Sequence, residues 1–476
     1  MFNRRLFLGG IAALPTVFRP MSGFAQSAPR RLTMPPLLDA TATGRFRLEA
    51  RRGTTDFTGA GAGETWGFNQ SYLGPTLRLA TGQTTEAEIV NALSEAITVH
   101  WHGLVVPGEA DGGPHQSIAP NETWAPALQL TQPVTTAWYH SHIHGETARH
   151  VQKGLAGVLH VVDGQDSDRG LPGDYGIDDL TLVLQDRRFD RRGRIDYSLA
   201  MPDRMMGFLG DTMVVNGQVG AEAVVPRGMV RLRLVNGSNA RIYPLSFADG
   251  REMHLIATDG GLLDRPIALN RLTIAPGERY EVLVDFSNGQ GSTLVSGTNP
   301  NMMMGRMRGG GGAFTVLPFH VDTSLRARIA QLPDDLGGSR PSGPTAAEVT
   351  RRFSLDMPMG MMMRRGGDMF AINGQAFDMD RMNLAVQLGA TERWQVSAAR
   401  MMHPFHIHGV TFQVLAENGV PPKAWNTGWK DTVLVDGTVD ILVRFTQPAS
   451  PATPFMYHCH ILEHEDGGMM GQFTVK

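Results

Sequence analysis

Short runs in which apolar and polar residues alternate recur along most of the chain. Residues 75–79 (PTLRL) and 230–234 (VRLRL) are two such runs, and Gly, Pro and Asn punctuate the sequence between them. A period of two is typical of strands that bury one face and expose the other. The pattern therefore predicts a protein built mainly from half-buried strands.

A longer motif recurs three times. The copies run from Gly74 to His100, from Val215 to Tyr243 and from Ile372 to His403. The strand after the first and third copies carries histidines, in 100–103 (HWHG) and 406–409 (HIHG), whereas 242–245 (IYPL) carries none. The endings 138–142 (WYHSH) and 456–460 (MYHCH) also match. Such repeats indicate three similar domains, of which the first and third bind metal and the second spaces them.

Two stretches of distinctive composition mark the domain boundaries. Residues 163–174 are rich in Gly and Asp, and residues 333–344 are rich in Pro, Gly and Ser. Such segments are typical of linkers. We expect a first domain over 29–165, a second over 166–332, a linker over 333–350 and a third domain over 351–476.

The amino terminus has the pattern of an export signal. Arg4 and Arg5 precede an apolar stretch that ends at about Phe18, and small residues follow near Ala25. This predicts a twin-arginine signal peptide over residues 1–28 and a periplasmic protein. The apolar stretch is shorter than the roughly 20 residues that span a bilayer, and no later segment resembles a span. We expect no stable membrane insertion.

The charge balance argues against nucleic acid as a partner. The chain has 43 Lys and Arg against 46 Asp and Glu, and no basic run lies beside aromatic residues. A nucleic-acid-binding surface needs a concentration of positive charge. The sequence therefore predicts small-molecule chemistry, and we expect a monomer.

Composition and histidine spacing both point to metal binding. The chain has 26 Met and 16 His but one Cys, which excludes an intramolecular disulfide. Chance placement would give about half of one His-x-His pair. Five occur, at 100/102, 140/142, 142/144, 406/408 and 458/460. Residues two apart on a strand share a face, so each pair offers two imidazoles to one metal region.

The densest motif lies near the carboxyl terminus. It comprises His458, Cys459 and His460, then His464 five residues and Met469 ten residues after the cysteine. Strand alternation turns Cys459 away from its two neighbours. The thiolate can therefore bind one metal while both flanking imidazoles bind metal on the opposite face.

The residues around Cys459 match a blue copper site. A thiolate, two imidazoles and a weak thioether are the ligands of such a site, and His403 supplies the second imidazole. The alternative is a buried, inert thiol, which is the commoner state of a single cysteine. The flanking histidines make that alternative a poor account of this sequence.

These motifs together resemble the multicopper oxidase family, and within it the bacterial cuprous oxidases of the CueO type and their laccase-like relatives. The resemblance covers essentially the whole chain after the signal peptide. It implies an all-β fold of three cupredoxin-like Greek-key β-sandwich domains, and an oxidase that reduces dioxygen to water with electrons from a reductant. It also implies four copper ions.

The resemblance further implies which residue binds which copper. The type 1 copper would take His403, Cys459, His464 and Met469, and the type 2 copper would take His100 and His406. The pair of type 3 coppers would take the remaining six: His102, His140, His142, His408, His458 and His460. Every ligand position of the family pattern is filled in this sequence.

Two acidic residues are candidates for moving protons to the buried cluster. Asp111 follows the first histidine pair and Glu465 follows His464, and both match acidic positions of the CueO-type pattern. Dioxygen reduction needs protons as well as electrons, and a nearby carboxylate is a suitable relay. The alternative is that each residue forms a turn or orients a metal-bound histidine.

Methionine clusters suggest the reductant. Met302–Met304 with Met307 form one cluster, and the second includes Met357, Met359 and Met361–Met363. Thioethers favour Cu(I), so Met357, Met359, Met361 and Met401 are candidates for a substrate-copper site and a role in copper tolerance. The match is partial, because the family's Met-rich insertion is shorter here and Ala399 stands where an acidic residue is expected. The alternatives are methionines that only fill an apolar cover, and a laccase-like oxidase of phenols, diamines or other small aromatic reductants.

Three further classes share parts of this pattern. One is a non-catalytic cell-division protein, which in this family retains the sandwiches but loses the ligands. Another is a periplasmic copper carrier, for which the methionines alone would suffice. The third is a copper nitrite reductase, which lacks the trinuclear cluster. The complete ligand set favours the oxidase over all three.

Overall fold

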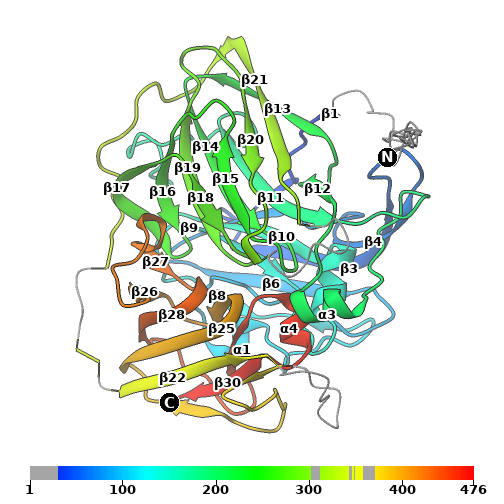
Figure 1. Cartoon of the computed structure of the whole chain (residues 1–476), viewed down its shortest axis with the longest axis vertical. Coiled ribbons are helices and arrows are strands. Elements are labelled where there is room, and N and C mark those ends of the chain that lie inside the picture. Colours follow the sequence, from blue (N-terminus) through cyan, green and yellow to red (C-terminus); the bar gives the residue numbers. More distant parts are fainter. Residues whose placement is uncertain (1–29, 302–310, 342–345, 348, 358–369) are drawn as a thin grey trace, which may run out of the picture.

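Strands make up most of the regular secondary structure (Figure 1). The computed structural model describes residues 30–301, 311–341, 346–347, 349–357 and 370–476. The expected signal peptide, Met302–Met304, Met307, Met359 and Met361–Met363 lie outside these residues. No helix among the described residues is long and apolar enough to cross a membrane.

The first sandwich combines two sheets around one core. The five-stranded sheet has the order β4-β3-β6-β7 with β8 also paired to β6, and the four-stranded sheet has the order β2-β5-β10-β9. Burial alternates along β6, whereas every residue of β9 is buried. The prediction of half-buried strands is wrong for residues 230–234, which are all buried because Arg231 and Arg233 form buried ion pairs, and in residues 75–79 only Arg78 is partly exposed. The strands are β2 (Leu37–Asp39), β3 (Arg45–Thr55), β4 (Gly63–Phe68), β5 (Thr76–Ala80), β6 (Thr84–Asn91), β7 (Thr123–Trp124), β8 (Ala127–Gln129), β9 (Thr135–His140) and β10 (Ala156–Val162); the helices are α1 (Gly108–Asp111) and α2 (Thr147–Lys153).

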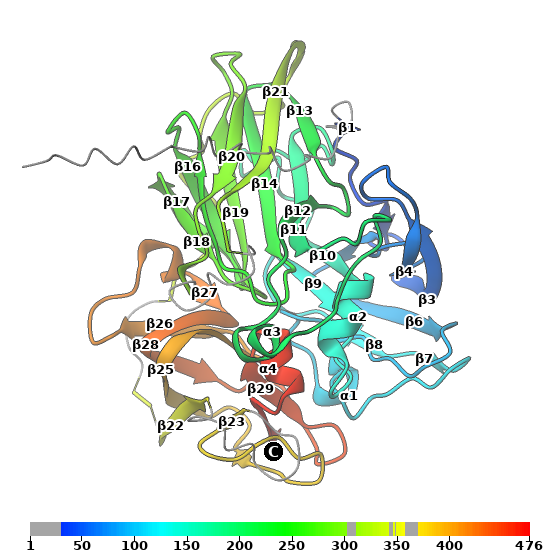
Figure 2. The ribbon, with the colours of Figure 1, turned by 45° about the vertical axis from the view of Figure 1, so that its right-hand side comes forward.

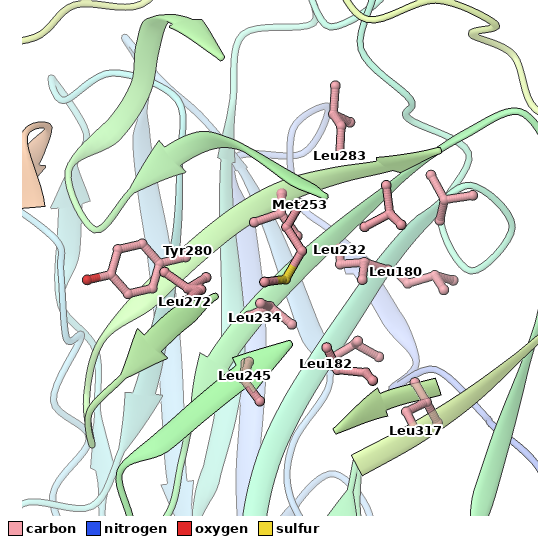
Figure 3. Packing of buried hydrophobic residues seen from close by; sticks show 14 of the residues in the cluster. Leu180, Leu182, Leu232, Leu234, Leu245, Met253, Leu272, Tyr280, Leu283 and Leu317 are labelled. Atoms are coloured by element: carbon pink, nitrogen blue, oxygen red, sulfur yellow. The ribbon is translucent and has the colours of Figure 1, made fainter. Parts of the chain in front are cut away.

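The second sandwich has two six-stranded sheets, in the orders β12-β11-β14-β19-β16-β17 and β1-β13-β21-β20-β15-β18. Its core is mostly aliphatic: Leu180, Leu182, Leu232 and Leu234 lie on neighbouring strands in one cluster with Met253 (Figure 3). The strands are β1 (Arg30–Arg31), β11 (Asp179–Arg187), β12 (Thr212–Val215), β13 (Ala221–Arg227), β14 (Met229–Asn236), β15 (Tyr243–Phe247), β16 (Met253–Thr258), β17 (Gly261–Leu269), β18 (Leu272–Ile274), β19 (Arg279–Asp285), β20 (Ser292–Ser296) and β21 (Phe314–Arg326); α3 spans Met201–Met206.

The third sandwich is one nine-stranded sheet folded around its own core. Its longest strand, β25, pairs with β22 in its first half and with β29 in its second, and its register with β28 shifts between Ala398 and His403. The strands are β22 (Val349–Asp356), β23 (Ala371–Ile372), β24 (Leu384–Val386), β25 (Thr391–Ile407), β26 (Phe412–Glu417), β27 (Trp429–Lys430), β28 (Thr432–Arg444), β29 (Phe455–Cys459) and β30 (Met470–Val475); the helices are η2 (Ala424–Asn426) and α4 (Leu462–Asp466).

A buried network of charges joins the first two sandwiches. Arg233 of β14 makes ion pairs with Asp179 (2.7 Å) and Glu281 (3.1 Å), and Glu281 also accepts a hydrogen bond from Thr136 of β9 (2.7 Å). Buried charges are tolerated when each one is paired and hydrogen-bonded, as these are. The network therefore fixes β9, which ends at His140, against the second sandwich.

Candidate metal centres

The predicted ligands that carry nitrogen or thiolate donors come together in two places, both buried. One place holds His403, Cys459 and His464. The other holds eight histidines from the first and third sandwiches, which form the sets His100–His102–His406, His102–His140–His460 and His142–His408–His458. Within each set the donor atoms lie within 4.8 Å of one another, close enough to share a metal ion.

The cysteine group has the geometry of a three-ligand metal site. His403 Nδ1 lies 3.3 Å from the Sγ atom of Cys459 and 3.3 Å from His464 Nδ1, and the sulfur lies 3.8 Å from His464 Nδ1. β25, β29 and α4 each supply one of these side chains. Met469 is fully buried in the same core cluster, and its carbonyl accepts a hydrogen bond from the Cys459 backbone N–H (3.1 Å). Burial raises the pKa of the thiol, so a bound metal would have to displace its proton.

Strand alternation separates the sulfur from its two neighbours. In the pairing of β29 with β25, Phe405 lies opposite Cys459 and His406 lies opposite His458. Cys459 consequently faces His403 and His464, whereas His458 and His460 each join a different histidine set. The cysteine group and the histidine group are therefore linked through the backbone of adjacent residues.

Ring stacking across the two sandwiches builds the histidine group. His102 stacks on His406, and His100 stacks on His408, each with ring centroids 3.7 Å apart. A backbone bridge between His100 and His140 holds the two motif segments of the first sandwich together. The first sandwich contributes four histidines and the third contributes four, so neither sandwich alone carries the group.

Several of the ring nitrogens in the histidine group lack protein partners. Within the described structure, five buried nitrogens without a hydrogen bond are His100 Nε2, His102 Nδ1, His140 Nε2, His406 Nε2 and His460 Nε2. Buried polar atoms in proteins are nearly always hydrogen-bonded, so unpaired nitrogens that converge from several elements indicate a ligand. Imidazole nitrogens in this number suit copper or zinc.

The opposite nitrogens of His100, His406 and His140 are held by the protein, which fixes these three rings. His100 and His406 donate Nδ1–H to the backbone carbonyls of Asp111 (3.0 Å) and Asp431 (2.9 Å). His140 donates in the same way to Ser141 (2.9 Å). Such bonds select the tautomer that leaves the other nitrogen free for metal.

Asp111 and Glu465 lie beside the histidine group. The Asp111 carboxylate accepts a hydrogen bond from His408 Nδ1 (2.8 Å), and its other oxygen has no hydrogen-bond partner in the described structure. The oxygens of Glu465 lie 3.3 Å from His142 Nδ1 and 3.2 Å from His458 Nδ1. Asp111 therefore orients His408, whereas Glu465 lies beside two histidine rings without a hydrogen bond in the described structure. Both positions also suit a proton relay.

A third carboxylate, Asp431, was not predicted from the sequence. Its side chain accepts a hydrogen bond from His102 Nε2 (3.1 Å) and forms a two-pronged ion pair with Arg279 of the second sandwich (2.7 and 2.6 Å). Burial alone would raise the pKa of Asp431, but Arg279 holds it well below its ordinary value. The sequence signal that could have identified Asp431 was a single Asp directly before β28. In that strand Thr432 pairs with His406.

The second sandwich also approaches the histidine group through its backbone. At Gly277, which has a φ of +85°, a Cβ atom would lie 2.8 Å from the His460 ring. With Arg279, this glycine shows that the predicted spacer shapes the site.

Burial keeps the histidines neutral and ready to bind metal. It lowers the pKa of His403 and His406 to about 4. Burial, with repulsion from neighbouring rings, also lowers the pKa well below the ordinary value for His102, His140, His142, His408, His460 and His464. Neutral imidazole is the form that coordinates metal.

Two of the predicted substrate-copper residues are described. Met357 and Met401 are half-buried and pack against the core cluster that contains Cys459 and Met469. Several histidines outside both groups have other partners: His150 contacts Ser141 Oγ (2.8 Å), and His320 contacts Glu222 (2.9 Å).

Comparisons with known proteins show the family and the fold. Models of the multicopper oxidase family match residues 49–166, 136–300 and 341–476. Among solved structures, a laccase-like multicopper oxidase CueO from Ochrobactrum sp. is 42% identical, with a TM-score of 0.87 over 94% of this chain and 100% of that one. McoA, a multicopper oxidase from Aquifex aeolicus, is 31% identical, with a TM-score of 0.83 over the same shares of the two chains. These likenesses confirm the predicted all-β fold of cupredoxin-like domains.

Several relatives with curated names are called cell division proteins rather than oxidases. The cell division protein FtsP of Xenorhabdus nematophila is 38% identical over 94% of this chain and 93% of its own length. The protein of the same name from Escherichia coli (strain K12) is 37% identical over 99% and 98%.

Proposed function

The chain belongs to the multicopper oxidase family, and on that premise we propose that it oxidises a reductant one electron at a time and reduces dioxygen to water. The observation that carries this proposal is the pairing of the two donor groups. Cys459 stands in one group, and both of its neighbours in sequence stand in the other. This arrangement suits electron transfer from a one-electron site to a cluster that reduces dioxygen.

The resident ions would be four coppers. The type 1 copper would be held by His403, Cys459, His464 and Met469. Type 2 would be held by His100 and His406, and the type 3 pair by His102, His140 and His460 on one side and His142, His408 and His458 on the other. Bound there, the coppers would supply reversible one-electron chemistry and a place for dioxygen.

The protein's own groups would fix the ligands and move protons. The hydrogen bonds from His408 to Asp111 and from His102 to Asp431 orient rings before any metal binds. Asp111 and Glu465 have carboxylate oxygens without a hydrogen-bond partner in the described part of the chain, beside histidines of the cluster. We assign both residues to the proton relay, since four protons must reach a site that the sandwiches enclose.

Cu(I) is the reductant we favour, with a small aromatic compound as the alternative. Met357 and Met401 pack against the core around Cys459, so their thioethers are candidates to capture cuprous ion. Met359 and Met361 would complete that site. With the predicted twin-arginine signal, this function would place the enzyme in the periplasm as a monomer that contributes to copper tolerance, with domains over 29–165, 166–332 and 351–476.

A role in cell division is the second candidate, and the name of the curated relatives favours it. A structural role in division would not require paired donor groups or buried histidines without partners. Copper binding and a division role can also coexist in one protein. The two candidates therefore need a direct test of the metal chemistry.

The test is copper loading of the full-length mature chain, followed by metal analysis, absorption spectroscopy and dioxygen uptake. The oxidase proposal expects a blue band and one dioxygen consumed for about every four electrons delivered by Cu(I) or a phenol. A copper-loaded chain that shows no blue band and consumes no dioxygen with any reductant would leave cell division as the better candidate.

A further inference from the structure

The imidazole of His464 is enclosed on three sides. Its Nδ1 faces Cys459 and His403, its face stacks on Phe370 with ring centroids 4.1 Å apart, and its Nε2 donates a hydrogen bond to the backbone carbonyl of Met205 (3.1 Å). The side chain has no exposed surface. The one ring nitrogen that points away from the cysteine is therefore already bonded to the protein.

Met205 belongs to a segment of the second sandwich that reaches across to the third. This segment, residues 196–210, connects β11 to β12 and contains α3. We call it the strap. α3 lies beside α4, the helix that carries His464 (Figure 2). The strap therefore covers the outer side of the predicted type 1 site.

Glu463 fastens the strap to α4. Its carboxylate accepts hydrogen bonds from the Tyr197 hydroxyl (2.7 Å) and from the Phe208 backbone N–H (2.9 Å), one near each end of the strap. Asn239, outside the strap, donates a third (2.7 Å). Hydrogen bonds to a buried charged group are among the stronger ones in proteins. These bonds hold both ends of the strap to the residue that precedes His464.

A second attachment lies within the strap. The Asp203 carboxylate accepts a hydrogen bond from Ala200 N–H (2.9 Å) and pairs with Arg188 of the second sandwich. Arg188 also donates to the Leu209 carbonyl (3.1 Å) and lies over the Phe208 ring at 4.2 Å. α3 is thus anchored by groups that do not contact the metal-site residues.

Close packing leaves no space for a side chain at Gly207 of the strap. Gly207 has a φ of +81°, and a Cβ atom there would lie 2.3 Å from the Ala240 Cβ and 2.6 Å from a methyl group of Ile461. The Ile461 backbone N–H in turn donates to the Cys459 sulfur (3.4 Å). Glycine is required at this position both for its backbone conformation and for the lack of a side chain.

We propose that the strap determines which reductants the type 1 site accepts, an inference that rests on the proposed oxidase function. A phenol or phenolate that reduces the site through His464 needs the Nε2–H of that ring as its hydrogen-bond donor. Met205 already takes this donor. Phenols are therefore poor substrates while the strap is closed, whereas reductants that pass an electron without touching the imidazole are unaffected.

The step itself is a one-electron oxidation. The phenol loses one electron and its hydroxyl proton to become a phenoxyl radical; the proton goes to solvent. The electron enters at the type 1 site and is used in the proposed reduction of dioxygen. Hexacyanoferrate(II) gives up one electron with no proton and no hydrogen bond, so it serves as the reference reductant.

The test opens the strap without touching a ligand. The double variant Tyr197→Phe/Asp203→Ala removes one bond to Glu463 and the anchor to Arg188. Its matched control, Tyr175→Phe/Asp163→Ala, removes a tyrosine hydroxyl bonded to the Pro35 carbonyl and an aspartate paired with Arg169; the Asp163 side chain is 20% exposed against 10% for Asp203. Glu463→Gln is a second opening variant. Hydrogen–deuterium exchange over residues 196–210 reports whether the strap opens.

Two readouts test the proposal. The ratio of kcat/KM for 2,6-dimethoxyphenol to that for hexacyanoferrate(II) should rise about three- to tenfold for each strap bond lost, and should not rise in the control. In the copper-free protein, diethyl pyrocarbonate should modify exposed His320 in every variant but His464 only when the strap opens. Faster exchange with an unchanged ratio, or no faster exchange in either opening variant, overturns the proposal.

The histidine modification keeps this proposal separate from the oxidase proposal. If the wild-type chain consumed no dioxygen with any reductant, the oxidase proposal would fail. The reactivity of His464 in the copper-free chain would still report whether Met205 shields it. If His464 were modified as fast as His320 in the wild-type chain, the strap proposal would be contradicted while the oxidase proposal would not.

Discussion

Replacing Asp431 by Asn tests whether the second sandwich stabilises the metal centre. The substitution keeps the shape of the side chain and removes its charge. Arg279, which has 1% of its side chain exposed, would then face a neutral amide, with Asp259 at 3.5 Å as its remaining acidic partner. The amide NH2 would also point either at Arg279 or at the His102 Nε2–H, and both of these are donors.

The size of the effect follows from the burial of the pair. Removing one partner of a buried ion pair costs about 3–5 kcal/mol. Because Asp259 remains, we expect the lower end, about 3 kcal/mol. At about 2–4 °C per kcal/mol for domains of this size, the copper-free chain should melt about 6–12 °C lower. A hydrogen bond to His102 that is weakened or lost should also lower copper retention about 10- to 100-fold.

Thermal unfolding and competition with a copper chelator measure the two effects. The control is Asp440→Asn, because Asp440 pairs with Arg393, whose side chain is 45% exposed. A pair of that kind is worth at most about 1 kcal/mol. The reasoning would be refuted if Asp431→Asn melted within about 2 °C of the wild type, or if both variants lost copper equally.

Three more outcomes are expected. Cys459→Ser should abolish the blue absorption and nearly all oxidase activity with an unchanged circular dichroism spectrum; retained activity would remove the thiolate from the electron path. The pKa of His403 and His406 is about 4 when folded and about 6.5 when unfolded, so the unfolded chain binds more protons between these values. The copper-free chain should therefore lose a few kcal/mol as the pH falls from about 6.5 to about 4, and urea midpoints independent of pH would contradict this. Replacing Met357, Met359 and Met361–Met363 should slow Cu(I) oxidation more than phenol oxidation, whereas equal losses would count against a cuprous site.

The sequence predicted those features that depend on local periodicity. Two features follow from the strand period of two, which tertiary contacts do not alter. One is the alternating burial along β6, and the other is that the side chains of Cys459 and of its two neighbours face opposite sides. The histidine spacing likewise predicted the pairs that share a face. The grouping of the pairs into a cluster came from the family resemblance, because periodicity does not specify how sandwiches dock.

The unpredicted features all arise where the second sandwich meets the other two. Arg279 and Asp431 are more than 100 residues apart in sequence, and an isolated arginine in a strand pattern gives no indication of its partner. Met205 acts through its backbone carbonyl, which carries no sequence signal. Gly207 is one glycine among 56, and only the close approach of Ile461 distinguishes it.

The most direct test of the central claim is the number of coppers bound by the fully metallated, full-length chain, counted together with the spectrum. The account predicts four per chain, with one responsible for the blue band, because the donors form one cysteine site and one eight-histidine cluster. A fully loaded chain with fewer than four coppers would contradict it.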